Sequence, residues 1–389
     1  MAAKSYKTDA FGPYTQTGTS INSRYPVLPP GERLVIVGAT TKMGVAKNEI
    51  IQILSGDIDE IVSKVGDESE APEVFYAARA AIANGVRYID VVCPSSVGAH
   101  LTEIEAITDA VMDAVELSLA SLLVVPKPAT WIVDGYGDYA CAEVDKAFID
   151  LMGTLKHDRM MYIFGLPQGL DVAGAIDYVT GQVNKQSKLA ACIFPNAYIL
   201  DVDGTLALRD MSPSWAGLAC KLSREHPRGV AKAPAGSRAD YHLAGISRLE
   251  LDLYGVNDTV KASLQNGLIN PVFSHNGIYV FGASTLLADA DDVYRHMNIT
   301  RQISEIKQQV ALIADNFIFE NTDDLTLDQL KTKCEAYLQT LADSLKIKDS
   351  FVRVSIDTVN QSQVNVTIGV KPQYPIEFIV FTVTADTAE

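Results

Sequence analysis

The segment with the clearest chemical potential is Tyr198 to Asp210, which reads YILDVDGTLALRD. Asp201 and Asp203 lie one residue apart after an apolar run, and Gly204 and Thr205 follow them. Two carboxylates in this arrangement can transfer a phosphoryl group, because the first can attack phosphorus while the second serves as general acid and base. The segment therefore raises the hypothesis of a phosphatase in which Asp201 is the nucleophile.

A phosphatase of the haloacid-dehalogenase type needs further groups. These are a Ser or Thr at the end of a later strand, a Lys, and a second acidic pair that holds magnesium. Ser284 follows an apolar strand, but Lys307 lies inside a long helical pattern, and the acids of residues 288–292 lie in a loop that enters a helix. Since Asp-Gly is common in tight turns, we interpret residues 201–204 as a strand end and a turn, with the phosphatase as the alternative function.

The other residues that could do chemistry also lack partners. The stretch VGATTKMG at 37–44 resembles a phosphate-binding loop, but Lys42 lies in its middle and no Gly-Lys-Ser or Gly-Lys-Thr ends it. Cys93 has no neighbouring His, so a buried thiol is expected. The six His form no metal-binding motif, and the five Cys form no CxxC pair. We therefore predict no catalytic, cofactor-binding or metal site, and no enzymatic activity.

The bulk composition is that of a globular protein. The 389 residues are 48% hydrophobic, which is enough for one large domain or two smaller ones. The net charge is −16 and no basic stripe is present, so direct binding of nucleic acid is not expected. The longest apolar run, residues 117–126, is too short to cross a bilayer, and the first residues lack the apolar core of a signal peptide. These features predict a protein made in a cytoplasm, without membrane insertion.

Strand and helix patterns alternate between residues 31 and 200. A strand at 34–37 is followed by a helical pattern at 70–84, by Gly85 as a helix end, and by a buried strand. This alternation predicts an α/β layer. Residues 211–250 contain spaced prolines and are expected to be irregular.

The second half predicts two helices and a hairpin. Apolar residues from Ile299 to Ile313 recur every three or four positions, as on one helix face. A second helix is predicted to begin at Thr326, because Gln329 completes a capping box. The following hairpin has alternating apolar residues, among them Val352, Val354, Val364 and Val366.

Both ends of the chain have the character of connectors. Residues 1–30 are polar and rich in proline at their end, which predicts an extended arm. The closing segment YPIEFIVFTVT is apolar on both faces of a strand, through Ile376, Phe378, Ile379, Val380, Phe381 and Val383. Such a strand must be covered either by its own subunit, into which it folds back, or by the sheet of a neighbouring chain. We favour insertion into a neighbour, and hence an assembly protein.

Four segments after residue 210 resemble, in order, parts of the contractile tail sheath protein of bacteriophages and related injection systems. They are MSPSWAGLACKLSREHPRGVAKAPAG (211–236), LINPVFSHNGIYVFGASTL (268–286), the helix and following loop of 294–324, and YPIEFIVFTVT (374–384). In the first half, the strand and Gly loop from residue 33 and the helix-Gly-strand unit from residue 75 resemble the family more faintly. Ser284 and Phe281 depart from the family pattern, which usually has Arg and Trp there, and so do Asn321 and Thr322. In this family an acidic turn commonly ends the strand before the proline-led segment, which would explain Asp201 to Gly204.

The resemblance implies an α/β (α+β) fold with an N-terminal arm (1–30), an outer α/β domain (31–260), an inner sheath domain of helices packed on a mixed sheet (261–370) and a C-terminal strand arm (371–389). It also implies a virion-tail protein, assembled in the bacterial host cytoplasm, that polymerises helically in six-fold rings around a tail tube and contracts to deliver a genome without nucleotide or metal. Its expected partners are other copies of itself, the tube protein, and baseplate and tail-terminator proteins.

The resemblance also suggests residues for these contacts. The hairpin with Val352, Val354, Val364 and Val366 would receive strands from neighbours. The helix after residue 326 would face the tube, with Lys331, Lys333, Lys346 and Lys348 as candidate tube-facing residues. A solvated basic face is the alternative for these lysines. A non-contractile capsid or tail adaptor is a third interpretation of the chain, because it too would be an assembly protein without chemistry of its own.

Overall fold

The computed structural model describes residues 32–94, 111–118, 120–127, 137–155, 160–236, 245–246, 258–274, 277–289 and 292–375 of the 389. The predicted arm at 1–30 and the predicted closing strand, including Ile376 to Val383, lie outside these ranges.

The strands, in chain order, are β1 (Arg33–Val37), β2 (Ile50–Ile53), β3 (Tyr88–Val92), β4 (Leu122–Val124), β5 (Met161–Gly165), β6 (Ala190–Phe194), β7 (Ala197–Leu200), β8 (Leu206–Arg209), β9 (Gly245–Ile246), β10 (Ile269–Ser274), β11 (Ile278–Val280), β12 (Ile347–Ile356) and β13 (Val364–Pro372). The helices are α1 (Ile58–Lys64), α2 (Pro72–Ala83), α4 (Gly137–Thr154), α5 (Val172–Asp177), α6 (Ser212–Glu225), α7 (Asp258–Asn266), α8 (Met297–Asp315) and α9 (Asp324–Asp343). Short π or 3-10 segments are η2 (Tyr178–Val183), η3 (Gly229–Ala231) and η5 (Val293–Arg295).

A large sheet with the strand order β11-β10-β6-β5-β4-β1-β3-β2 forms the centre of the first body. The strands from β10 to β3 in this order pair in parallel, whereas β2 and β11 pair antiparallel at the two edges. The parallel strands are mostly apolar and buried, as in β1 (RLVIV), where Arg33 is the one charged residue, and β6 (AACIF), so both faces of the sheet must be covered. The α/β layer predicted from the sequence is confirmed.

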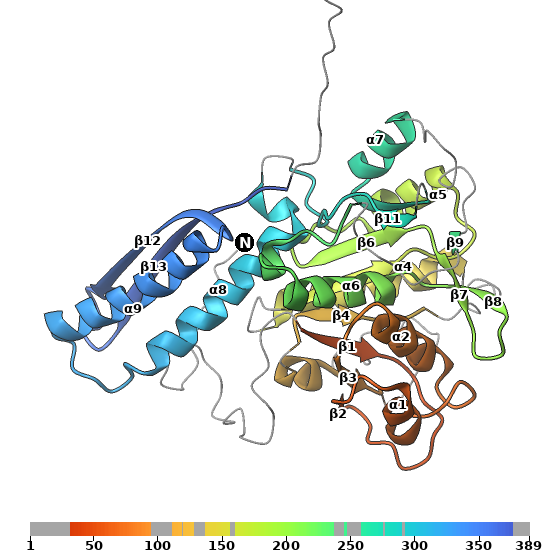
Figure 1. The fold of residues 1–389 in the computed structure, drawn as a ribbon, viewed down its shortest axis with the longest axis horizontal. Helices are drawn as coiled ribbons and strands as arrows, with labels where there is room; N and C mark the ends of the chain where they lie inside the picture. The colour runs from red at the N-terminus through yellow and green to blue at the C-terminus, as the bar shows by residue number, and fades with distance from the viewer. Residues whose placement is uncertain are drawn as a thin grey trace, which may run out of the picture.

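The chain winds in two directions from the middle of this sheet. It passes from β1 to β3 on one side and then returns to β4, β5 and β6 on the other. Since crossovers between parallel strands are right-handed, α2 and α4 must lie on opposite faces of the sheet. Helix α6 packs against α2 and also contacts β1, β4 and β5, so these two helices share a face (Figure 1). The turning point between β1 and β4 is where such folds commonly bind ligands.

A second body extends away from the large sheet (Figure 1). It consists of the C-terminal half of α8, helix α9, and the antiparallel pair β12–β13. Its core is separate from that of the first body. It contains Ile306 and Val310 of α8, the α9 residues Leu330, Cys334, Leu338 and Leu341, and Ile347 and Val352 of β12. The predicted hairpin is confirmed, with Val352 opposite Ile368 and Val354 opposite Val366.

Three details differ from the sequence-based predictions. Residues 212–225 form helix α6 although they were expected to be irregular, because Pro213 lies in the first turn, where a proline is tolerated. Helix α9 begins at Asp324 rather than Thr326, since the Asp323 side chain accepts a hydrogen bond from the Thr326 N–H at 2.7 Å.

The third detail concerns the two bodies. Strands β10 and β11, which we placed after the predicted boundary at residue 260, belong to the large sheet. The two cores separate within α8, because Met297 belongs to the first core and Ile306 to the second. The assignment of the bodies to the outside and inside of a sheath stays a prediction.

Candidate functional site

The segment with the two carboxylates is a β-hairpin. The Asp201 N–H donates to the Thr205 carbonyl at 2.8 Å, and the Gly204 N–H donates to the Asp201 carbonyl at 3.1 Å. Asp203 Oδ1 accepts from the N–H and the hydroxyl of Thr205 at 2.9 and 2.7 Å. Gly204 has a φ of +84°, a conformation that favours glycine. The prediction of a strand end and a tight turn is confirmed, with β7 before the turn and β8 after it.

The Asp201 carboxylate is occupied within this hairpin. It accepts hydrogen bonds from Arg209 at 2.6 and 3.3 Å, and the Arg209 guanidinium lies over the Tyr76 ring at 3.7 Å. The residues considered as phosphatase partners lie on other elements. The backbone of Ser284 forms an antiparallel β-bridge with that of His296, and Lys307 belongs to α8. The phosphatase alternative therefore has no support. Asp201 fixes the base of the hairpin, and Asp203 closes its turn.

We expect Asp201→Asn to have little effect. The Arg209–Asp201 pair is partly exposed, so losing the charge should cost about 1 kcal/mol of folding free energy or less. The denaturant midpoint of unfolding, and any assembly seen by electron microscopy, should match those of the parent protein. Phosphate release in the presence of magnesium should be at background for both proteins. If the parent protein released phosphate and the variant did not, the phosphatase hypothesis would be restored.

The Gly-containing loop after β1 is a packed turn. The Lys42 ammonium donates to the carbonyls of Val62 and Ser63 at 2.6 and 2.7 Å, near the C-terminal end of α1. Lys47 donates to the Thr40 carbonyl at 3.0 Å. Both ammonium groups therefore donate hydrogen bonds to carbonyl groups of the protein itself, as expected for a strand-ending turn.

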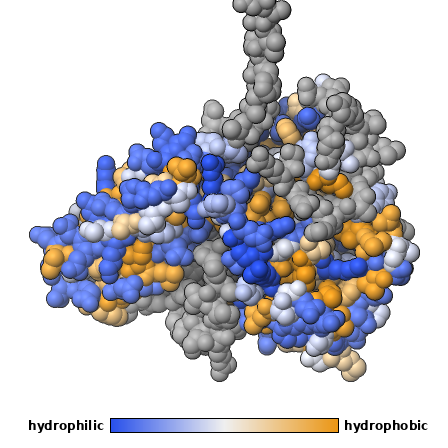
Figure 2. Space-filling view, in the orientation of Figure 1, coloured by the Kyte–Doolittle hydropathy of each residue, from blue (hydrophilic) through white to orange (hydrophobic). Residues whose placement is uncertain are grey.

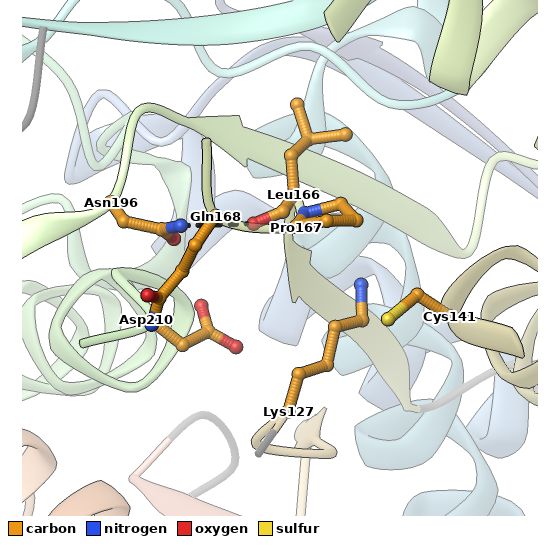
Figure 3. Close-up of a pocket in the computed structure, with 7 residues that line it drawn as sticks. All are labelled: Lys127, Cys141, Leu166, Pro167, Gln168, Asn196 and Asp210. Carbon is orange, nitrogen blue, oxygen red and sulfur yellow. Dashed lines mark hydrogen bonds between the residues drawn. The ribbon is translucent and has the colours of Figure 1, made fainter. Parts of the chain in front are cut away.

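A small polar pocket lies at the carboxyl ends of β4, β5 and β6, beside the turning point of the sheet. Its lining residues are Lys127, Cys141, Leu166, Pro167, Gln168, Asn196 and Asp210, which Figure 3 shows around one space. The pocket offers only about 10 Å³, roughly the room of a single water molecule. It lies where an α/β enzyme would bind its substrate, but it is too small for one.

Beneath this pocket lies a buried ion pair that sequence analysis missed. The Lys127 ammonium donates to Asp145 Oδ2 at 2.6 Å and to the Gly165 carbonyl at 2.5 Å. The hydroxyls of Tyr162 and Tyr178 also donate to the Asp145 carboxylate, at 2.7 and 2.6 Å. The Asp145 side chain is fully buried, and all its close partners are hydrogen-bond donors. The arrangement is a structural brace between β4, β5, α4 and η2.

The titration of this cluster follows from burial. Burial raises the pKa of the Asp145 carboxyl, although Lys127 and the two tyrosine hydroxyls oppose the shift. Burial alone would lower the pKa of Lys127, but the charges of Asp145, Cys141 and Asp210, together with the hydrogen bond to Asp145, outweigh it and raise that pKa above its ordinary value. Burial also raises the pKa of Asp210, whose Oδ1 accepts from the Ser212 N–H at 2.8 Å. The sequence offered one weak signal, a lysine directly after a buried strand.

The described residues also lack the features of a reactive cysteine, a metal site or a membrane-spanning helix. All five cysteines are buried, and burial raises the pKa of Cys93 to about 11, so this thiol is poorly suited to act as a nucleophile. Within the described ranges, no cluster of three metal-ligating side chains occurs. No helix there is long and apolar enough to cross a membrane.

The β12–β13 hairpin offers two open edges. In the described part of the chain this sheet has two strands, so the outer edge of each strand lacks a strand partner. Val354, Val364 and Val366 are half-buried against the second core, and Val352 belongs to it. After β13 the chain leads to Tyr374, whose ring meets that of His296 edge-on with centroids 5.4 Å apart. The predicted receiving residues thus hold the hairpin on its helices, and the edges remain open.

The four candidate tube-facing lysines do not form one cluster. Lys331 lies 3.8 Å from Glu335, and the Lys333 ammonium lies over the Phe317 ring at 4.7 Å. Lys346 and Lys348 lie near the opposite end of α9, where the Lys346 ammonium approaches Gly229 of the first body. Lys331 and Lys333 would therefore contact a different surface of a partner from Lys346 and Lys348.

Three solved structures are similar to this chain over most of its length. The sheath of the anti-feeding prophage (AFP) in its contracted state is 22% identical, with a TM-score of 0.69 over 98% of this chain and 100% of that one. The sheath complex of the extracellular contractile injection system PVC, also contracted, is 20% identical, with a TM-score of 0.69 over 98% and 99%.

A chain of the AFP baseplate in its contracted state is 19% identical, with a TM-score of 0.75 over 95% of this chain and 96% of that one. No family model and no curated protein matches the sequence. Both bodies, and not the α/β layer alone, are therefore shared with proteins of contractile assemblies. The chain has the fold of the sheath proteins of contractile injection systems.

Proposed function

We propose that this protein is the structural subunit of a contractile tail sheath. It polymerises helically around a tail tube and contracts to drive the tube through the host envelope during genome delivery. The observation that carries this proposal is the end-to-end similarity to the contracted AFP sheath, which covers 98% of this chain. The four segments that resemble the sheath family, in family order, support it independently.

The open edges of β12 and β13 support a mechanism of cohesion. A two-stranded sheet is marginally stable by itself, and its free N–H and C=O groups can pair with a strand from another chain. The sequence predicts a suitable strand in residues 374–384, with apolar residues on both faces. We infer that this strand, and the arm within residues 1–25, join the hairpin of a neighbouring copy. Backbone hydrogen bonds would then hold the mesh while the bodies turn.

The course of the chain after β13 favours this exchange over a strand that folds back. Tyr374 packs against His296, at the N-terminal end of α8, and so leads the chain toward the first body. A closing strand that paired with its own β13 would have to reverse directly after this contact. Folding back stays the alternative, and reciprocal cross-linking between copies distinguishes the two.

Contraction in this proposal uses energy stored in contacts between subunits. The extended sheath would be kinetically trapped, and its release at the baseplate would let it reach a better-packed state. The proposal assigns no enzymatic activity to the chain. The baseplate and tail-terminator proteins are the expected end partners, and the tail of the virion is the expected location, after assembly in the host cytoplasm.

The inner surface of the sheath must also contact the tube. Helix α9 exposes Lys331 on its surface, with Lys333 nearby over Phe317, and these two are the better-placed candidates for an acidic tube. Lys346 and Lys348 lie closer to the first body and are weaker candidates. A solvated basic face remains the alternative for all four residues.

Electron microscopy of the purified protein tests the proposal directly. Negative-stain images should show long tubes or helical polymers, because the subunit carries both the open edges and the strand that we propose fills them. Rings or monomers under all conditions would instead indicate a non-contractile adaptor. Tubes whose two forms differ in length and diameter would establish contraction.

A further inference from the structure

One end of the second body exposes four large apolar side chains. Leu312, Phe319, Leu325 and Val359 are 52%, 86%, 67% and 93% exposed, and we call them the tip. Leu312 lies in the last turn of α8, Phe319 lies in the following loop, and Leu325 lies in the first turn of α9. Val359 lies in the β12–β13 turn. This turn reaches the same end because β12 runs back along α9, with ten residues spanning about 34 Å against about 30 Å for the helix.

Acidic residues surround the tip. Residues 315–328 read DNFIFENTDDLTLD, with five acids and no lysine or arginine. Asp323 caps α9, and a negative charge at a helix N-terminus is favourable by itself, so the acids alone would indicate nothing more than a stable helix. The helix does not explain four apolar side chains in water. An apolar centre with a charged rim is the composition of a protein interface.

The opposite end of the same body has the complementary character. Leu345 is 58% exposed between α9 and β12, and Lys346 and Lys348 follow it. Arg228 is exposed at the adjoining end of α6, next to Gly229, whose Cβ position would lie 3.5 Å from the Lys346 ammonium. We call Arg228, Leu345, Lys346 and Lys348 the shoulder. Tip and shoulder thus lie at opposite ends of α9. The tip segment has five acids, whereas the shoulder has three cations, beside which the exposed Asp343 and Asp349 lie.

We propose that the tip of one copy docks on the shoulder of a second copy of this chain. The proposal rests on the function proposed above and names a contact that is separate from strand exchange. Each copy carries a net charge of −16, so two copies repel unless oppositely charged surfaces meet locally. Because tip and shoulder differ, the contact is head-to-tail and does not end in a two-fold dimer, so it can propagate from copy to copy as a helical polymer requires. A basic partner other than this chain is the competing occupant.

Charge reversal tests the pairing. Asp324→Lys with Asp328→Lys in the tip, or Arg228→Glu with Lys348→Glu in the shoulder, places like charges together. Each pair should raise the protein concentration needed for tubes at least about tenfold. Combining all four changes restores opposite charges and should bring that concentration back to within about threefold of the parent value. Glu49→Lys with Asp59→Lys, two exposed positions of the first body, makes the same change in net charge as the tip variant and should assemble normally.

The outcomes separate this proposal from the proposed function. If the parent forms tubes and either reversal pair assembles normally, or if the combined variant assembles worse than both, the docking proposal is overturned and the sheath function stands. Tip variants that form normal tubes but lose a copurifying basic partner would likewise overturn it. Absence of tubes from the parent protein would overturn the sheath function itself. Circular dichroism of each variant confirms that a loss of assembly does not come from unfolding.

Cross-linking gives a second measurement that needs no change of charge balance. All five native cysteines are buried, so introduced ones are the accessible thiols. Asp324→Cys protein mixed with Arg228→Cys protein should form disulfide-linked dimers under assembly conditions when dissolved oxygen is present as the oxidant, and neither protein should do so alone. Dimers in a single-variant sample, or none in the mixture while tubes form, would overturn the docking proposal.

Discussion

Protein that ends at Pro375 is expected to stay folded and monomeric at concentrations where the full chain forms tubes. The deletion removes residues 376–389, including the apolar part of the predicted closing strand. Both cores and the Tyr374–His296 contact remain, so the unfolding temperature of dilute protein should be close to that of the full chain. The open edges of β12 and β13 would then find no strand from a neighbour. Sedimentation and negative-stain microscopy measure the loss of assembly.

The matched control removes only residues 386–389, which follow the predicted strand. This shorter deletion should form tubes as the parent does. A synthetic peptide of residues 374–385, added in excess to the full chain, should compete for the open edges and shorten the tubes. Normal tubes from protein that ends at Pro375 would count against strand exchange.

Local sequence patterns were sufficient for the elements that carry this proposal. The three-and-four spacing from Ile299 to Ile313 identified α8, and alternation identified β12–β13, because each element buries one face against a core. The prediction that residues 211–250 are irregular was wrong for residues 212–225. It treated Pro213 as a helix breaker without considering its position in the helix. Pro213 lies in the first turn of α6, where its missing N–H has no partner to lose.

Contacts between distant parts of the chain were beyond local patterns. Asp145 meets Lys127, Tyr162 and Tyr178 only after α4 has packed on the large sheet, and in the sequence each reads as an ordinary polar or aromatic residue. The same is true of the boundary between the bodies. Helix α8 is continuous, so its sequence gives no sign that Met297 and Ile306 belong to different cores. The tip and the shoulder were also missed, because Val359 joins the tip, and Arg228 the shoulder, only in the folded chain.

The largest loss of stability from a single substitution is expected for Lys127→Met. Methionine is unbranched and only one atom shorter than lysine, but it has no charge, which leaves the Asp145 carboxylate buried without a cation. Removal of one partner from a buried pair typically costs about 3–5 kcal/mol of folding free energy, and the Gly165 carbonyl also loses its donor. Denaturant unfolding of dilute, unpolymerised protein should show a correspondingly lower midpoint.

The chain supplies a matched control in Lys185→Met, which breaks a Lys–Asp pair whose members, Lys185 and Asp150, are 39% and 60% exposed. Its cost should stay below about 1 kcal/mol, because solvent screens the pair. The loss of folding free energy caused by Lys127→Met should be largest at neutral pH. Burial already raises the pKa of Asp145, and loss of the cation raises it further, so the folded state binds the proton more tightly than the unfolded state.

That difference in proton binding fixes the sign of the pH dependence. As pH falls through the raised pKa toward the ordinary carboxyl value of 3.8, Asp145 is protonated in the folded variant and the deficit relative to the parent should shrink. Adding Asp145→Asn to Lys127→Met should recover part of the loss at neutral pH and remove this pH dependence. Equal costs for Lys127→Met and Lys185→Met would show that the buried pair does not brace the sheet. In that event the burial of Asp145 would have to be offset by its two tyrosine donors alone.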